Sequence, residues 1–167
     1  MLMMKRISSC LLAVVMISAA ADVPKTATII PAPREMRVTG GEYWERKPPK
    51  LEKVAGIPPE GYELSITTND ITIRHSDDAG AFYAKITLEQ LRADAMRRVF
   101  PGNGTATAGP IAIPCVEIKD APAFRWRGVM LDEGRHFFGK ETVKGLLDLM
   151  AEYKLNVFHW QDRKSVV

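Results

Sequence analysis

The sequence predicts two unlike parts: an α+β layer in which one helix crosses a mainly antiparallel sheet, and then a strand-helix-strand unit that opens an α/β sheet or barrel. Three patterns support this fold class. Apolar and polar residues alternate over 62–75, apolar residues recur at helical spacing over 79–96, and two apolar runs, 126–131 and 157–160, enclose a second helical segment. Half-buried antiparallel strands alternate in this way, whereas buried parallel strands are continuously apolar and need a crossover helix.

Length and composition set limits on this fold. The chain has 167 residues, of which 46% are hydrophobic, so it can bury one core of ordinary size. A complete (β/α)8 barrel alone needs about 250 residues. The net charge is +3 and no basic stripe runs along the chain, so nucleic acid is not an expected partner.

Residues 1–21 have the pattern of a secretory signal peptide. A basic start precedes an apolar core from Ile7 to Ile17, and the small residues that follow predict cleavage after Ala20 or Ala21. This core is shorter than the roughly 20 residues that cross a membrane, so no membrane span is expected. Cys10 precedes most of the core, which argues against a lipid anchor. The protein is therefore predicted to be exported, either to the periplasm or out of the cell.

Residues 22–119 make up the predicted α+β domain. Its expected elements are an extended start at Pro31 and Pro33, a turn at Gly40–Gly41, a loop over 48–59, a hairpin of strands 62–66 and 71–75, a helix over 79–96 capped by Asp77 or Asp78, and a last strand over 111–118. Cys115 lies in this last apolar run, where it is expected to pack as a small hydrophobe. No histidine or carboxylate is spaced to bind a metal with it, so neither a metal nor a cofactor is expected.

Residues 120–161 make up the second part. The apolar run 126–131 predicts a buried strand that ends at Asp132, and helical spacing from Val143 predicts an amphipathic helix. Lys154 is expected in the last turn of this helix, with Asn156 as its left-handed cap. The aromatic residues of this part are expected mainly in the core: Trp126, Phe137, Phe138 and Trp160.

Polar residues gather where these strands end. Asp132, Arg135 and His136 follow the first strand, and His159 lies in the second. In a barrel of alternating strands and helices, the C-terminal strand ends form the active-site face. Asp132 and His159 are therefore expected on that face, although Asp132 with Arg135 is equally consistent with an ion pair that only braces a loop.

Several motifs resemble one family. R-G-V-M-L-D-x-x-R-H-F-F from Arg127, a helix ending M-A-x-Y-K-L-N, and V-F-H-W resemble the first strand, first helix and second strand of the catalytic barrel in glycoside hydrolase family 20, the β-N-acetylhexosaminidases. I-I-P-x-P and G-x-F-Y-A-x-x-T-L-x-Q-L resemble the accessory domain before that barrel. The resemblance implies an α+β accessory domain followed by the first β-α-β unit of an incomplete (β/α)8 TIM barrel.

The resemblance also implies a substrate and a site. The expected partner is a glycan or oligosaccharide with a terminal β-linked N-acetylglucosamine or N-acetylgalactosamine. Arg127 is implied to bind its hydroxyls, and the residues implied to line or brace the site are Asp132, Arg135, His136 and His159. The implied reaction is retaining and substrate-assisted, and the family's catalytic Asp-Glu pair, at the end of the fourth barrel strand, would lie beyond this chain. Asp132-Glu133 belongs to the first strand and is not that pair.

Two functions remain open from the sequence. One is a hexosaminidase fragment that is inactive alone, and the other is a short secreted module that binds or docks to carbohydrate without catalysis. Apolar strand edges left without neighbours favour the fragment.

The sequence departs from the family at Ala123, Gly134 and Gln161. Residues 162–167, read back into codons, resemble a sequencing adapter, so they are expected to be a non-native tail, and Gln161 a remnant of the family's histidine.

Overall fold

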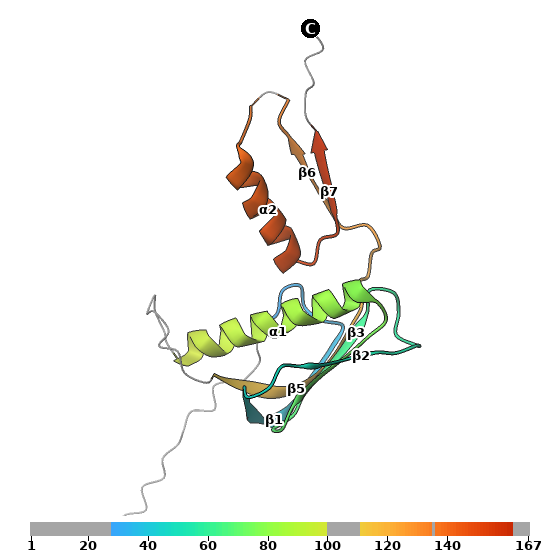
Figure 1. The fold of residues 1–167 in the computed structure, drawn as a ribbon, viewed down its shortest axis with the longest axis vertical. Coiled ribbons are helices and arrows are strands. Elements are labelled where there is room, and N and C mark those ends of the chain that lie inside the picture. Colours follow the sequence, from blue (N-terminus) through green and yellow to red (C-terminus); the bar gives the residue numbers. More distant parts are fainter. Residues whose placement is uncertain (1–27, 100–110, 135, 162–167) are drawn as a thin grey trace, which may run out of the picture.

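The computed structural model describes residues 28–99, 111–134 and 136–161. Its two parts follow one another along the long axis of the molecule (Figure 1). The predicted signal peptide, Arg135 and the predicted tail 162–167 lie outside the described residues.

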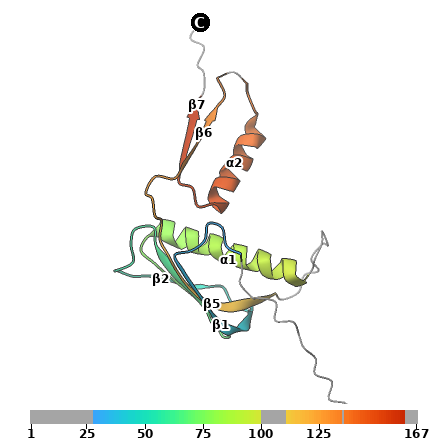
Figure 2. The same cartoon turned by 180° about the vertical axis from the view of Figure 1, so that it is seen from behind.

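The first part is a five-stranded mixed sheet crossed by one helix. Its elements are β1 (Glu35–Trp44), β2 (Lys50–Lys53), β3 (Tyr62–Ile66), β4 (Ile71–His75), α1 (Asp78–Val99) and β5 (Ala112–Asp120). The strand order is β1-β5-β3-β4-β2, and every neighbouring pair is antiparallel except β2 with β4. Helix α1 lies across one face of this sheet in both views (Figures 1 and 2). The predicted α+β layer is therefore confirmed.

Alternate side chains of β3 and β4 form much of the core. Residues Tyr62, Leu64 and Ile66 are buried and alternate with half-buried polar residues, and β4 repeats the pattern. These side chains meet the buried side of α1 in one cluster, whose members are Ile29, Tyr43, Tyr62, Leu64, Ile66, Ile71, Ile73, Tyr83, Ala84, Leu88, Leu91, Ile113, Val116 and Ile118. The opposite face carries cross-strand ion pairs such as Arg74 with Glu63, at 2.5 Å.

Two features of the sheet differ from the prediction. Gly40 and Gly41 do not turn the chain, because β1 continues through them as an irregularity in its register with β5 between Val38 and Glu42. Both glycines have a φ of 86°, a conformation that lets a strand absorb extra residues as a bulge. The predicted loop over 48–59 contains β2, whose four residues are all exposed. A fully exposed edge strand has no alternating pattern by which it could be recognised.

Helix α1 begins in close contact with the segment before β3. Asp77 is the cap, since its Oδ1 accepts from the amide of Gly80 at 2.8 Å and its Oδ2 accepts from the amide of Glu60 at 2.8 Å. A Cβ added to Gly80 would lie 2.3 Å from the carbonyl oxygen of Gly61. The helix can therefore approach this closely only because Gly80 has no side chain.

The second part is a strand-helix-strand unit, as predicted. Strands β6 (Gly128–Asp132) and β7 (Val157–Gln161) are parallel neighbours, and α2 (Lys140–Glu152) connects them. The predicted cap was wrong, because Lys154, with a φ of 58°, adopts the left-handed conformation and Asn156 does not. Asn156 instead bridges to the start of β6, where its Oδ1 accepts from the amide of Arg127 at 3.0 Å.

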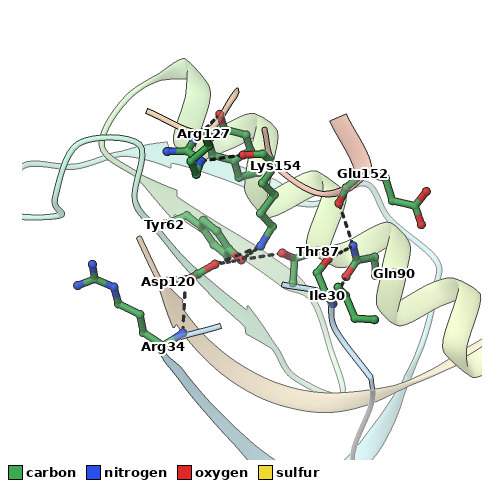
Figure 3. A network of polar contacts seen from close by, with 10 residues as sticks. Ile30, Arg34, Tyr62, Thr87, Gln90, Asp120, Arg127, Glu152 and Lys154 are labelled. Atoms are coloured by element: carbon green, nitrogen blue, oxygen red, sulfur yellow. Dashed lines mark hydrogen bonds and ion pairs between the residues drawn. The ribbon is translucent and has the colours of Figure 1, made fainter. Parts of the chain in front are cut away.

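A buried polar cluster joins the two parts (Figure 3). The Lys154 ammonium lies 3.1 Å from Oδ2 of Asp120 and donates to the Tyr62 phenol at 3.0 Å. Tyr62 donates to Asp120 at 3.0 Å and lies 2.6 Å from the Thr87 hydroxyl. The Lys154 and Asp120 side chains are only 7% and 13% exposed. Burial lowers the pKa of Lys154, and the charge of Asp120 opposes that shift.

We expect Gly80→Ala to destabilise the chain by about 1 to 3 kcal/mol, because the new methyl group must push α1 away from the Gly61 backbone. Gly145→Ala is the matched control. Gly145 lies inside α2 with open space around its Cβ position, so alanine should stabilise by about 0.5 to 1 kcal/mol. Urea unfolding of both variants measures the difference. Equal effects of the two substitutions would contradict the close packing at Gly80.

We expect Tyr62 to make the protein less stable at alkaline pH. Burial is the main cause that raises the pKa of its phenol, and the charge of Asp120 adds to the shift. The folded protein therefore keeps this proton where the unfolded chain releases it, so the stabilisation is complete below about pH 10 and declines as the pH rises further. The lowered pKa of Lys154 acts in the opposite direction, since deprotonation below its ordinary value of 10.5 relieves the cost of a buried charge.

Urea unfolding at about pH 9 and about pH 11 tests the contribution of Tyr62. The loss in free energy of unfolding between these values should be smaller for Tyr62→Phe than for the original chain. Tyr153→Phe, at an exposed ring, serves as the control and should leave the loss unchanged. An identical loss in Tyr62→Phe and the original chain would exclude the proposed titration.

Candidate functional site

The C-terminal ends of β6 and β7 carry the candidate site. Both strand arrows point away from the sheet of the α+β domain (Figure 1). Met130 pairs with His159 and Asp132 pairs with Gln161. In a parallel pair, partners project to the same side of the sheet, so these four side chains share one face. All four are exposed, whereas Val129 and Leu131 on the other face are half-buried.

Asp132 and His159 thus lie on one face of the strand pair, and their place on the active-site face of a barrel stays a prediction. His159 pairs with Met130, and Asp132 lies two residues further along β6 than Met130, which is the next position on the same face. Oδ1 of Asp132 accepts from the amide of Gly134 at 2.8 Å, which fixes the carboxylate at the turn out of the strand. Both residues are exposed, and a carboxylate and an imidazole are groups suited to binding hydroxyls.

Glu133 organises the loop after β6, a role that sequence reasoning did not identify. Its carboxylate is buried and accepts from the indole nitrogen of Trp160 at 2.6 Å and from the amide of Phe138 at 3.0 Å. Its amide donates to the carbonyl oxygen of Gln161. Asp132 and Glu133 therefore have separate partners and do not form one acidic pair. The sequence signal for this contact was Trp160, because a buried indole N–H usually has a hydrogen-bond acceptor nearby.

The remaining residues near this end are less constrained. His136 is exposed, and its ring makes an edge contact with Phe138 at 5.2 Å between centroids. The expectation that the aromatic residues are mainly core was wrong for this part, since Trp126 and Phe137 are 74% and 71% exposed. Among the described residues, α2 lies beside the two strands (Figure 1).

Arg127 lies at the opposite end of β6 from Asp132. Five residue steps separate them, roughly 16 Å along an extended strand. The guanidinium donates to Oε2 of Glu60 at 2.6 Å and to the Tyr83 hydroxyl at 2.9 Å. It also donates to the carbonyl oxygens of Lys154 and Phe124, at 2.8 and 2.7 Å.

Four of the five N–H groups of the Arg127 guanidinium therefore donate to acceptors inside the protein. The structure does not bring Arg127 together with Asp132 and His159. Its binding of sugar hydroxyls stays a prediction.

A cavity of about 250 Å³ lies between the two parts of the molecule. Tyr62, Asp120 and Lys154 line its polar end, and Phe124 and Tyr153 line an apolar wall. Across the described ranges, every buried side-chain nitrogen and oxygen has a hydrogen-bond partner.

The described part of the chain contains no cluster of three or more histidine, cysteine, aspartate or glutamate side chains that could hold a metal ion. None of its helices has the length and apolar character needed to span a membrane.

Two family models match this chain. Residues 45–121 match glycosyl hydrolase family 20, domain 2, and residues 124–164 match the catalytic domain of the same family. The boundary between the matches falls at the junction between β5 and β6 in the structure.

Known proteins agree with these matches. The chain is 41% identical over 101 residues to a β-hexosaminidase of Porphyromonas gingivalis, covering 60% of this chain and 12% of that protein. It is 32% identical over 127 residues to a β-N-acetylhexosaminidase of Cellulomonas fimi, covering 76% and 23%. The solved Streptomyces plicatus N-acetyl-β-hexosaminidase superposes with a TM-score of 0.67 at 26% identity, covering 82% of this chain and 34% of that one.

The chain thus spans about a third or less of the length of these proteins. Its two consecutive matches cover most of the residues that the structure describes. The chain belongs to glycosyl hydrolase family 20, with domain 2 followed by part of the catalytic domain.

Proposed function

We propose that this chain is part of a β-N-acetylhexosaminidase that releases terminal β-linked N-acetylglucosamine or N-acetylgalactosamine from glycans. The observation that carries the proposal is the order of the two family matches, domain 2 and then catalytic domain, along one continuous chain. The relatives named as β-hexosaminidases, and the small share of their length that this chain covers, support a longer enzyme.

The proposed reaction retains the configuration at the anomeric carbon. The acetamide oxygen of the sugar attacks C1 while a carboxylic acid of the enzyme protonates the departing glycosidic oxygen, and water then opens the cyclic intermediate. A second carboxylate orients the acetamide. We assign both carboxylates to residues outside this chain, because the resemblance implies an Asp-Glu pair after the fourth barrel strand. Asp132 and Glu133 follow the first strand of the unit and have separate partners. On this proposal the chain alone is inactive.

Strands β6 and β7 are proposed to be the first two strands of a (β/α)8 barrel, with α2 as its first helix. Their parallel register and the exposed face with Met130, Asp132 and His159 support this role. Barrel interiors are filled by side chains from alternate strands, and the C-terminal strand ends form the active-site rim. Asp132 and His159 would therefore line the sugar site, with His136 on the loop after β6. Arg135 keeps the role that the resemblance implies, to line or brace the site.

Export is proposed from the first 21 residues, whose basic start, short apolar core and small residues have the pattern of a cleaved signal peptide. We also propose that residues 162–167 are not native, because one back-translation of these residues into codons resembles a sequencing adapter. Sequencing the source DNA beyond the codon of Trp160 decides the second point. A continuing reading frame supports it, and a genomic stop codon after Val167 contradicts it.

A second candidate is a secreted carbohydrate-binding module without catalysis. Exposed aromatic rings favour it, since Trp126 and Phe137 are more than two-thirds exposed and such rings stack on sugars. Retention of the 167-residue chain on an immobilised chitooligosaccharide, with release by free oligosaccharide, would support the module.

We expect the protein encoded by the complete reading frame to hydrolyse an aryl N-acetyl-β-glucosaminide, and the 167-residue chain to show no turnover. Release of the chromogenic aryl group measures both. Turnover by the short chain would contradict the placement of the catalytic carboxylates outside it. Lack of turnover by the complete protein on both aryl N-acetyl-β-glucosaminide and galactosaminide would contradict the enzyme proposal.

Within the complete enzyme, we expect Asp132→Asn to lower kcat/KM by about 10- to 100-fold. Asparagine keeps the acceptor for the Gly134 amide but loses the charge on the exposed face, and a hydrogen bond to a charged group contributes about 1.5 to 3 kcal/mol. Lys144→Met, on the exposed side of α2, is the control and should leave kcat/KM unchanged. Equal values for both variants and the original enzyme would remove Asp132 from the site.

A further inference from the structure

The strand ends opposite the candidate site are tied to the α+β domain by three side chains. Lys154 and Arg127 belong to the strand-helix-strand unit, and Gln90 belongs to α1 (Figure 3). Each makes a contact that crosses from one part of the molecule to the other.

Lys154 fixes the turn that leads into β7. Its side chain enters the buried cluster of Asp120 and Tyr62, and its ammonium also lies 5.2 Å from the centroid of the Tyr62 ring. A lysine is rarely buried to this degree unless it is paired. The turn before β7 is therefore anchored inside the neighbouring domain.

Arg127 fixes the start of both strands at once. Its carbonyl oxygen accepts from the amides of Asn156 and Val157, at 2.8 and 3.2 Å, which joins β6 to β7. Its guanidinium meanwhile pairs with Glu60 of the α+β domain and lies 5.3 Å from the centroid of the Tyr83 ring. One residue thus connects the two strands to each other and to the domain.

Gln90 holds the end of α2. Its Nε2 donates to the carbonyl oxygen of Glu152 at 3.1 Å and to that of Ile30 at 2.7 Å, and its Oε1 accepts from the amide of Ile30. The last carbonyls of a helix have no partner within the helix, so this side chain supplies one from α1.

Backbone conformation points to the same junction. Among the described residues, the non-glycine residues with positive φ are Glu60, at 59°, and Lys154, at 58°. Such residues are uncommon and persist where surrounding contacts hold them. Here both belong to the ion pairs between the two parts, with Arg127 and Asp120 as partners.

Within the described residues, the unit beyond this junction consists of two strands of five residues and one helix, and small assemblies of this kind bury little apolar surface. The contacts at the base of the strands therefore add to the order of β6 and β7.

We propose that Lys154 and Arg127 are positioning residues through which the α+β domain holds β6 and β7, and so places Asp132 and His159 at the far strand ends. The role of those two residues in sugar binding rests on the proposed function, but the coupling between the two parts does not.

Amide hydrogen exchange of the 167-residue chain tests the coupling. The substitutions Asp120→Asn and Glu60→Gln lie in the α+β domain and keep the shape of each side chain. We expect each to speed exchange in the peptides that contain β6 and β7 by at least about tenfold, because breaking a buried ion pair frees the unit it anchors. Glu63→Gln, at a more exposed pair with Arg74, is the control and should leave those peptides unchanged.

Lys154→Met gives the reciprocal measurement, with Lys144→Met as its control on the same unit. Faster exchange in β6 and β7 for Lys154→Met alone supports the proposal. The proposal fails if Asp120→Asn and Glu60→Gln alter exchange only within the α+β domain. This result does not depend on turnover, so the positioning proposal and the enzyme proposal can fail separately.

Discussion

A nearly buried ion pair between the Lys154 ammonium and the Asp120 carboxylate lies where the two parts of this molecule join. The Lys154–Asp120 pair is held together by a tyrosine that bonds to both charges, and the Thr87 hydroxyl completes the cluster. Removing charges from water is costly, and a buried pair is tolerated only when hydrogen bonds satisfy what remains. Because every member comes from a different element, the cluster forms only when α1, β3, β5 and the turn before β7 are in place. The relative placement of the two parts depends on this constraint.

Periodicity explains what could be predicted from the sequence. Alternation at Tyr62, Leu64 and Ile66 defined the hairpin, and the apolar runs on either side of α2 defined the parallel pair. The exposed strand β2 has no alternation, and Gly40 and Gly41 are as suited to a bulge as to a turn. Lys154, and not Asn156, has the left-handed conformation, and its side chain contacts residues of the other domain. Such contacts leave no local signal in the sequence.

The candidate site, like the fold, could be predicted from the sequence only in part. Asp132 and His159 were expected near the C-terminal strand ends from the strand pattern, since a crossover helix implies that the two strands are parallel, whereas the register that puts them on one face of the sheet is known only from the structure. The buried position of Glu133 depends on Trp160, 27 residues later, and was not foreseeable from spacing. The motif R-G-V-M-L-D suggested one site for Arg127 and Asp132, whereas an extended strand separates its two ends. The arginine side chain instead meets Glu60, a residue 67 positions away, at the base of the unit.

A double-mutant cycle between Lys154 and Asp120 tests most directly whether this pair joins the two parts. The free energies of unfolding of the original chain, Lys154→Met, Asp120→Asn and the double variant give the coupling between the two side chains. A buried, hydrogen-bonded pair predicts a coupling energy on the order of 1 to 3 kcal/mol, with the double variant less destabilised than the sum of the single ones. Strictly additive effects would show that the two charges do not hold the parts together, and would contradict this account.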